Sequence, residues 1–123
     1  MISFKEHLYE ANIKQVKKVI SDYIDLPLEC DGFAQVMTYL LTKHKIKHDV
    51  YGGKVQWKDQ IFNPHFWIKL DGYVIDCALR IWFGPSAPHG IIELKKYPEL
   101  KYDGKKVKFN VNDFVFKILT MQG

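Results

Sequence analysis

The chain has 123 residues, a formal charge of +4 and a hydrophobic content of 47%. This length fits one domain over residues 1–123, and the apolar share is high enough to bury a core, which excludes intrinsic disorder. The positive charge comes from lysines spread along the whole chain, with no single basic block. That pattern is typical of a solvated surface, so we expect no nucleic-acid partner.

The N-terminal segment, MISFKEHLYE, lacks the unbroken apolar run of a signal peptide because it contains Lys5, Glu6 and Glu10. No later stretch approaches the ~20 apolar residues of a membrane span. We therefore expect a cytoplasmic protein with no membrane partner. The only cysteines, Cys30 and Cys77, are too few for a disulfide framework, and we expect two free thiols.

Two helices are predicted in the first part of the chain. Residues 12–24 place their apolar side chains on one helical stripe, and Asn12 is the candidate N-cap. Pro27 breaks this helix. A second helix is predicted from about Cys30 to Lys43, because apolar residues recur there at intervals of three and four. Cys30 thus lies in the first turn of the second helix.

Beyond His48 the apolar pattern takes the two-residue period of β-strands. We expect a strand in HDVYGGKVQW with a bend at Gly52-Gly53. A hairpin is expected in HFWIKLDGYVIDCAL, with Asp71-Gly72 as its two-residue turn. Further strands are expected in GIIEL and in LKYDGKKVKFNV, the second of which should turn at Asp103-Gly104.

The last segment, NDFVFKILTM, predicts a short closing helix capped by Asn112 or Asp113. Helices followed by antiparallel strands indicate an α+β domain, in which the N-terminal helices pack on an antiparallel β-sheet.

The predicted hairpin brings a histidine and an aspartate together. A turn at residues 71 and 72 pairs Leu70 with Tyr73 and, three positions further, Trp67 with Asp76. His65 precedes the tryptophan by two residues and lies on the same face, so His65 and Asp76 are diagonal neighbours within reach of a hydrogen bond. In a catalytic triad, such a carboxylate fixes the tautomer of the imidazole and stabilises its cationic form.

Cys30 is the candidate nucleophile for this pair. A thiol at a helix N-terminus faces unpaired N–H groups and the positive end of the helix dipole, which lower its pKa and favour the thiolate. The backbone N–H of the same residue can donate to an oxyanion. The residues alone therefore predict a triad of Cys30, His65 and Asp76.

The motifs around these residues are similar to those of a known family. The helix-opening CDGFAQVMTYLL, the strand with VYGG, the H-x-W sequence and the DGYVID hairpin resemble the transglutaminase-like branch of the papain-like cysteine peptidase superfamily, over about residues 28–84. The resemblance implies a papain-like core, with Cys30 as nucleophile, His65 as base and Asp76 as third member. Trp67 matches the tryptophan of H-x-W, and we take it as substrate-binding. The stretch ECDGFAQ also resembles the nucleophile box of bacterial cell-wall cysteine endopeptidases.

The resemblance implies an enzyme that acts on an amide bond of a peptide or protein substrate without a cofactor, as a peptidase, amidase, deamidase or transglutaminase. The alternative is a binding or inhibitory module that has kept the fold without turnover. Tyr23 is a second candidate substrate-binding residue, since its hydroxyl could reach an oxyanion, but it equally well ends the apolar stripe of the first helix. The oligomeric state stays open.

Other arrangements are weaker. Cys30, His65 and Asp76 would need a fourth ligand to form a structural zinc site, and the candidates are Cys77, His89 and Asp31. His44 and His48 are four residues apart but lie where the second helix should end, so we interpret them as surface residues and expect no metal. The tryptophans lack alternating basic neighbours, which favours core or cleft walls over a nucleic-acid stacking platform.

Overall fold

The computed structural model describes residues 13–121, and the predicted cap Asn12 lies outside this range. Its first helix covers residues 13–20 and buries the side chains of Ile13, Val16 and Ile20. The helix ends at Ile20, four residues before the predicted end. Residues 21–27 form turns and bends, although Tyr23 and Ile24 of this segment still pack against the core, as the apolar stripe predicts.

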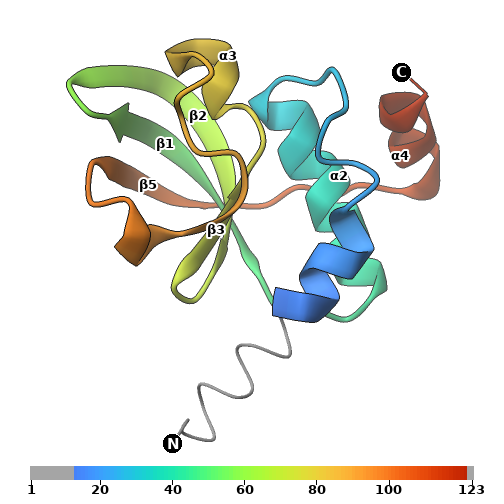
Figure 1. Ribbon diagram of the computed structural model, residues 1–123. Helices are drawn as coiled ribbons and strands as arrows, with labels where there is room; N and C mark the ends of the chain where they lie inside the picture. Colours follow the sequence, from blue (N-terminus) through green and yellow to red (C-terminus); the bar gives the residue numbers. More distant parts are fainter. Residues whose placement is uncertain (1–12, 122–123) are drawn as a thin grey trace, which may run out of the picture.

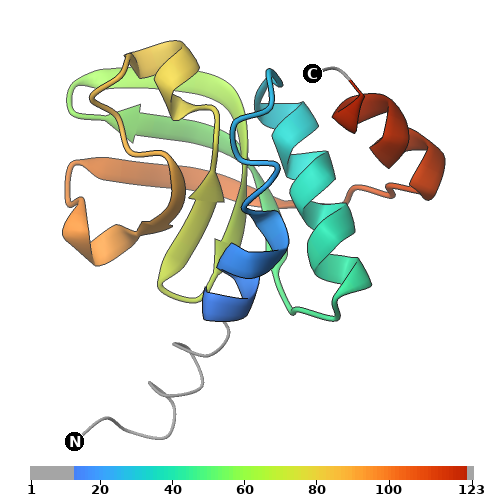
Figure 2. The ribbon, with the colours of Figure 1, turned by 45° about the vertical axis from the view of Figure 1, so that its right-hand side comes forward.

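The second helix, α2, covers Cys30–Lys43, as the apolar spacing predicts. It buries one long face against the sheet, mainly over strands β2 and β3, and Figures 1 and 2 show it beside the strands. The predicted core residues of this helix are all buried: Phe33, Ala34, Met37, Leu40 and Leu41. Because α2 is fixed along this face, the position of Cys30 at its first turn is fixed relative to the sheet.

The sheet has five antiparallel strands in the order β4-β3-β2-β1-β5. The strands are β1 (Asp49–Trp57), β2 (Gln60–Leu70), β3 (Tyr73–Asp76), β4 (Gly90–Glu93) and β5 (Leu100–Val107). A short helix, α3 (Leu79–Phe83), and a 3₁₀ turn, η1 (Leu94–Lys96), precede and follow β4. The domain is therefore of the α+β class.

The last helix, α4 (Asp113–Thr120), lies on the far side of α2 from the sheet (Figure 1). The side chain of Asn112 caps it by accepting a hydrogen bond from the N–H of Val115 at 2.8 Å, so one of the two predicted caps is confirmed. None of the helices within residues 13–121 is long and apolar enough to cross a membrane.

The predicted hairpin forms with Leu70 opposite Tyr73 and Ile68 opposite Ile75. The pairing of β2 with β3 ends there, so Trp67 and Asp76 are not paired across the ladder as predicted. Asp76 lies opposite Gly90 of β4 instead. The two β-strands thus separate just where the histidine and the aspartate of interest lie.

The predicted turn at Asp103-Gly104 is wrong, because β5 runs straight through these residues and pairs with β1 from Val107 to Leu100. Gly104 lies opposite Gly53, and a Cβ atom at position 104 would come within 2.4 Å of the carbonyl oxygen of Gly52 and 2.7 Å of the Trp67 ring. The glycine therefore permits a close approach of the two strands and the ring. The sequence Asp-Gly usually marks a turn, but at residues 103 and 104 it marks a close approach of β5 to β1, which we call the tight crossing.

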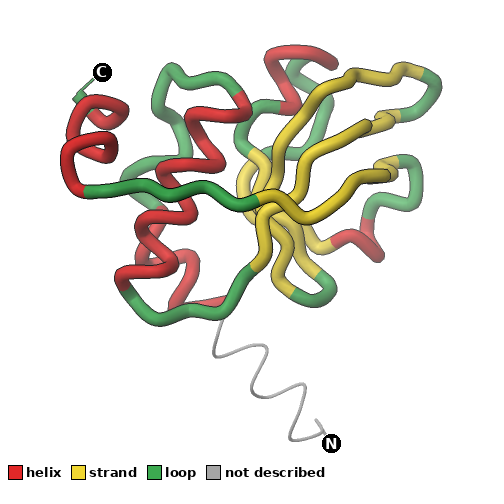
Figure 3. The backbone as a smooth tube through the Cα atoms, turned by 180° about the vertical axis from the view of Figure 1, so that it is seen from behind, coloured by secondary structure: helices red, strands yellow, loops and turns green. Residues whose placement is uncertain are grey.

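The sheet separates two hydrophobic clusters. One contains α2, residues of the first helix, and Val50, Ile68 and Ile75 of the strands. The other, on the opposite face, is built on Val55, Trp57, Leu79, Ala87, Ile92 and Leu100. Figure 3 shows the strongly twisted strands from behind. This twist lets side chains meet across several strands, as Tyr102 of β5 and Asp76 of β3 do.

Candidate active site

His65 and Asp76 form a buried hydrogen-bonded pair. The Nε2 atom of His65 lies 2.6 Å from Oδ2 of Asp76, and the side chains are 0% and 1% exposed. His65 comes from β2 and Asp76 from the end of β3, so the predicted contact between the two residues forms although their backbones are not ladder partners. A histidine held in this way presents its other ring nitrogen, Nδ1, in a fixed direction.

Two further groups hold the carboxylate of Asp76. The hydroxyl of Tyr102 donates to Oδ2 at 2.7 Å, and the backbone N–H of Ala78 donates to Oδ1 at 3.1 Å. Burial and the neighbouring carboxylate raise the pKa of Tyr102 well above its ordinary value, so its hydroxyl keeps its proton and remains a donor. With His65, three donors from three parts of the chain surround one aspartate.

Cys30 is the first residue of α2, and its side chain is almost buried, with the residue 8% exposed. The first hydrogen bond at this end of the helix runs from the N–H of Phe33 to the carbonyl of Glu29 at 2.9 Å. The side chain of the N-cap residue, Glu29, makes no hydrogen bond with the backbone N–H groups of the first turn. The start of α2 therefore offers backbone donors beside the thiol, as an oxyanion site requires.

The thiol and the histidine are neighbours. Burial alone would lower the pKa of His65, but the hydrogen bond to Asp76 and the electrostatic influence of Asp76 and Cys30 outweigh burial and raise this pKa to about 9. Since Nε2 is bonded to Asp76, Nδ1 is the ring atom left for the thiol. Nδ1 is buried and makes no well-formed hydrogen bond with any residue between 13 and 121. Catalytic hydrogen bonds are often loose in a resting site and tighten when substrate binds.

Trp67 is almost fully buried beside His65. The residue is 3% exposed, and its ring stacks on His65 at 6.1 Å and packs against Tyr102 at 4.6 Å. Trp67 therefore supports the face of the histidine; it also lines a cavity of about 290 Å³ together with Tyr102, and its substrate-binding role stays a prediction.

Tyr23 belongs to the interface between helices. Its ring lies 5.6 Å from that of Phe116 on α4, and it packs against the cluster that contains α2. This environment favours the alternative interpretation, in which Tyr23 ends the apolar stripe of the first helix, over a substrate-binding role.

One aromatic residue that was not predicted as a site residue, Phe62, lies beside His65, and a second, Trp82, packs on Phe62. Phe62 presents its ring edge-on to His65 at 6.2 Å and stacks on Trp82 of α3 at 3.9 Å. Both are partly exposed. Phe62 is in β2, so the strand that carries the histidine also carries part of the wall around it.

Cys77 is a buried thiol of a different kind. It is 5% exposed, and burial together with the charge of Asp76 raises its pKa above its ordinary value, so it stays protonated. Cys30, Asp76 and Cys77 line a cavity of only about 10 Å³. Such a space holds no more than a single water molecule. The interior beside Cys30 therefore has no room for a larger molecule.

The metal-site alternatives have no ligand set in the described part of the chain, since no three His, Cys, Asp or Glu side chains in residues 13–121 are arranged to hold an ion. His44 is the C-cap residue that follows the last helical residue of α2, Lys43. Nδ1 of His48 lies 2.9 Å from the carbonyl oxygen of Ile46. The two histidines are therefore not on one helical face.

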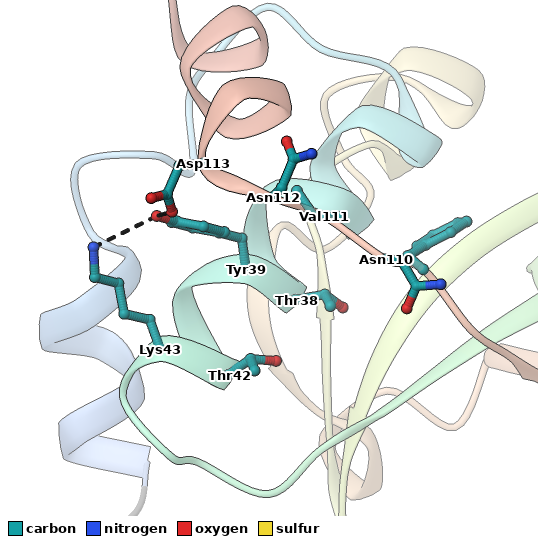
Figure 4. Close-up of a pocket in the computed structure, with 9 residues that line it drawn as sticks. Thr38, Tyr39, Thr42, Lys43, Asn110, Val111, Asn112 and Asp113 are labelled. Atoms are coloured by element: carbon teal, nitrogen blue, oxygen red, sulfur yellow. Dashed lines mark hydrogen bonds between the residues drawn. The ribbon is translucent and has the colours of Figure 1, made fainter.

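A larger cavity, of about 570 Å³, lies between α2 and residues 109–113 (Figure 4). Tyr39 crosses it and bonds through its hydroxyl to Asp113, while Nζ of Lys43 lies 3.5 Å from the same hydroxyl. Thr38, on its wall, is eight residues beyond Cys30, or about 12 Å along the helix. This cavity is separate from the three residues of the predicted triad.

Comparisons of the chain with protein-family models, with curated proteins and with solved structures found no match.

Proposed function

We propose that this protein is a cysteine-dependent acyl-transfer enzyme that attacks an amide bond of a peptide or protein through Cys30. The observation that carries the proposal is the buried hydrogen bond of 2.6 Å between His65 and Asp76, next to a thiol at the first turn of a helix. A packing role alone gives little reason to bury two titratable side chains in this relation.

The first half of the reaction uses His65 as an acid. With a pKa of about 9, the ring is protonated at neutral pH, and in the proposed reaction it is the acid that stands beside the attacking sulfur of Cys30. The sulfur attacks the carbonyl carbon, and the oxygen takes up negative charge facing the free N–H groups at the start of α2. The Nδ1 proton passes to the amine as the C–N bond breaks, which leaves a thioester on Cys30.

The second half reverses the proton transfer. Neutral His65 takes a proton from the incoming water or amine, which attacks the thioester carbon and expels the thiolate. Water gives hydrolysis, and an amine gives transfer. Throughout, Asp76 accepts from Nε2–H, which keeps the ring in the tautomer that directs Nδ1 to the sulfur.

We further propose that the chain is a small member of the transglutaminase-like branch of the papain-like superfamily. In support, the cysteine opens a helix that packs on an antiparallel sheet, and the histidine and the aspartate come from neighbouring strands of that sheet. The alternative is a binding or inhibitory module. The small exposure of Cys30 and the closed interior beside it are the observations that favour this alternative.

The test combines labelling with activity. Under mild conditions iodoacetamide should modify Cys30 ahead of Cys77, as read by peptide mapping, because Cys77 is protonated and buried. Cys30→Ala should abolish release of ammonia or of peptide from a broad panel of glutamine-containing peptides, with Cys77→Ala as the matched control that keeps activity. Turnover that survives in Cys30→Ala, or preferential labelling of Cys77, would refute the proposal.

A further inference from the structure

Tyr102 is bound to the candidate site at the same atom as the histidine. The hydroxyl of Tyr102 donates to Oδ2 of Asp76 at 2.7 Å, and Nε2 of His65 lies 2.6 Å from the same oxygen. Tyr102 was not among the site residues predicted from the sequence. It lies 26 residues beyond Asp76, in a strand whose predicted feature was a turn.

The contact crosses the sheet. Tyr102 is in β5 and Asp76 in β3, and the strands β1 and β2 separate them. In a flat sheet the two backbones would be about 14 Å apart, and side chains stand roughly perpendicular to the sheet. The hydrogen bond therefore exists because the sheet curls, and the tight crossing at Gly53 and Gly104 lies two residues from the tyrosine.

We propose that Tyr102 is a positioning residue of the site, whose hydroxyl fixes the carboxylate of Asp76 against which His65 is oriented. The ring contributes as well, since it packs on Trp67, and Trp67 in turn stacks on His65. Tyr102, Trp67, His65 and Asp76 thus form a closed cycle of contacts. For its consequence on turnover the inference rests on the proposed function, whereas its effect on the histidine does not.

Two effects follow from the shared oxygen. A second donor on Oδ2 draws charge from the atom that stabilises the imidazolium, so Tyr102 limits how far Asp76 raises the proton affinity of His65. The Tyr102 hydroxyl also helps to fix the orientation of the carboxylate plane of Asp76. Apart from His65, the other donor to this carboxylate is the N–H of Ala78, which bonds to Oδ1. Removing the hydroxyl should therefore raise the pKa of His65 and loosen the ring at the same time.

The experiment uses Tyr102→Phe, which removes the hydroxyl and keeps the ring on Trp67. Tyr97→Phe is the matched control, because Tyr97 is more exposed and its ring contacts Trp57 at 6.4 Å. The pKa of His65 is read from the pH titration of its ring protons by NMR in the full-length protein. We expect a rise of about half a unit or more in Tyr102→Phe and none in Tyr97→Phe. Equal titration curves for wild type and both variants would overturn the proposal.

A role in packing alone would lower the melting temperature without moving the titration of His65, so the two readouts separate positioning from stability. If Tyr102→Phe does not fold, 3,5-difluorotyrosine placed at residue 102 gives the opposite test. This side chain is a stronger donor, and the pKa of His65 should fall. A rise or no change there would contradict the inference.

The titration also keeps this inference distinct from the proposed function. In an active protein, Tyr102→Phe should lower kcat about tenfold or more with little change in KM, because the hydroxyl acts through Asp76 and His65. In a protein without turnover, the shift of His65 should still be observed. A shift without activity would therefore refute the enzyme and retain Tyr102 as the group that positions Asp76.

Discussion

At the scale of single residues, Asp76 is the most constrained side chain of the site, because both of its oxygens are acceptors. His65 and Tyr102 donate to Oδ2, and the N–H of Ala78 donates to Oδ1. An amide in the same place has one acceptor and one donor. No orientation of an asparagine side chain can therefore satisfy all three neighbours.

Asp76→Asn should consequently give a folded but slow enzyme. Either Ala78 loses its acceptor, or the amide N–H faces His65 and drives the ring into the wrong tautomer; the corresponding change in a serine triad costs about 10⁴ in turnover. We expect a loss of kcat of this order, measured under conditions where circular dichroism shows native structure. Asp103→Asn, which removes an equal charge from an exposed site, is the control. Equal activity of the two variants would show that Asp76 does not orient the histidine.

His65 should also make stability depend on pH. Its pKa is raised from 6.5 to about 9 in the folded protein, so the folded state binds this proton more tightly than the unfolded state does. The resulting stabilisation is fully present below about pH 6.5 and is lost as the pH rises through 9. It amounts to about 3 kcal/mol at most.

Urea unfolding between pH 6 and 10 checks this dependence, with His65→Gln as the reference. We expect the free energy of unfolding of the wild type to fall over this interval relative to that of the variant. The same ionisation should set the alkaline limit of turnover near pH 9, since the leaving amine then has no acid. A parallel pH dependence of stability in both proteins would contradict the raised pKa.

At the scale of elements, the sequence predicted correctly the helix and the hairpin turn, which are determined by interactions between residues close together in the chain. The apolar spacing placed α2 at Cys30–Lys43, and the Asp71-Gly72 turn fixed the register of β2 and β3 over three pairs. These features depend on neighbours within a few residues. The contact of His65 with Asp76 was predicted by extending this register to Trp67 and Asp76; that pair does not form in the ladder, but the two side chains still meet.

Features that depend on distant segments were missed. The pair of residues at 103 and 104 has the composition of a turn, but its glycine is required by the approach of Gly52 and Trp67 from other strands. The bond from Tyr102 to Asp76 needs the order and the curl of all the central strands, which no local window contains. Trp67 was placed on the same face as His65, but its near-complete burial was not predicted, because sequence periodicity does not show whether a face of a sheet is covered.

Gly104→Ala tests the tight crossing. The new methyl group would meet the Gly52 carbonyl oxygen at 2.4 Å and the Trp67 ring at 2.7 Å, so strands or ring must shift. We expect a loss of stability of about 1 to 3 kcal/mol, as for other overpacked sites, together with reduced turnover because Trp67 supports His65. Gly72→Ala is the matched control, since nothing lies within 4 Å of the added atom. Thermal melts of the two variants decide the comparison, and equal melting temperatures would contradict the close approach.

At the scale of the whole molecule, the sheet has two free edges, and each is protected in a different way. The β4 edge is only four residues long. The β5 edge is twice as long but carries Lys101, Lys105 and Lys106 within eight residues. Short strands and lysines are the usual means by which edges avoid pairing with a second molecule. Part of the positive charge of the chain is thereby explained without a charged partner.

Replacing Lys101 and Lys105 by isoleucine should therefore make the protein associate. Both side chains are exposed, and the new residues favour pairing of β5 with another strand. We expect a mass that increases with concentration in light scattering. The control carries the same two substitutions at Lys14 and Lys17, exposed residues on the first helix, and should scatter much less. Equal association of both proteins would show that the edge lysines have no special role.

The bond between Tyr102 and Asp76 has a consequence for the time at which the candidate site forms. During synthesis, Cys30, His65 and Asp76 leave the ribosome before β5, which joins the sheet beside β1 as its last strand. Until β5 has joined, the aspartate lacks the hydroxyl that holds it, and the histidine lacks a firm orientation. A nascent chain would thus carry Cys30, His65 and Asp76 without the geometry of the site, and under the proposed function its thiol would not attack amide bonds until β5 has joined the sheet.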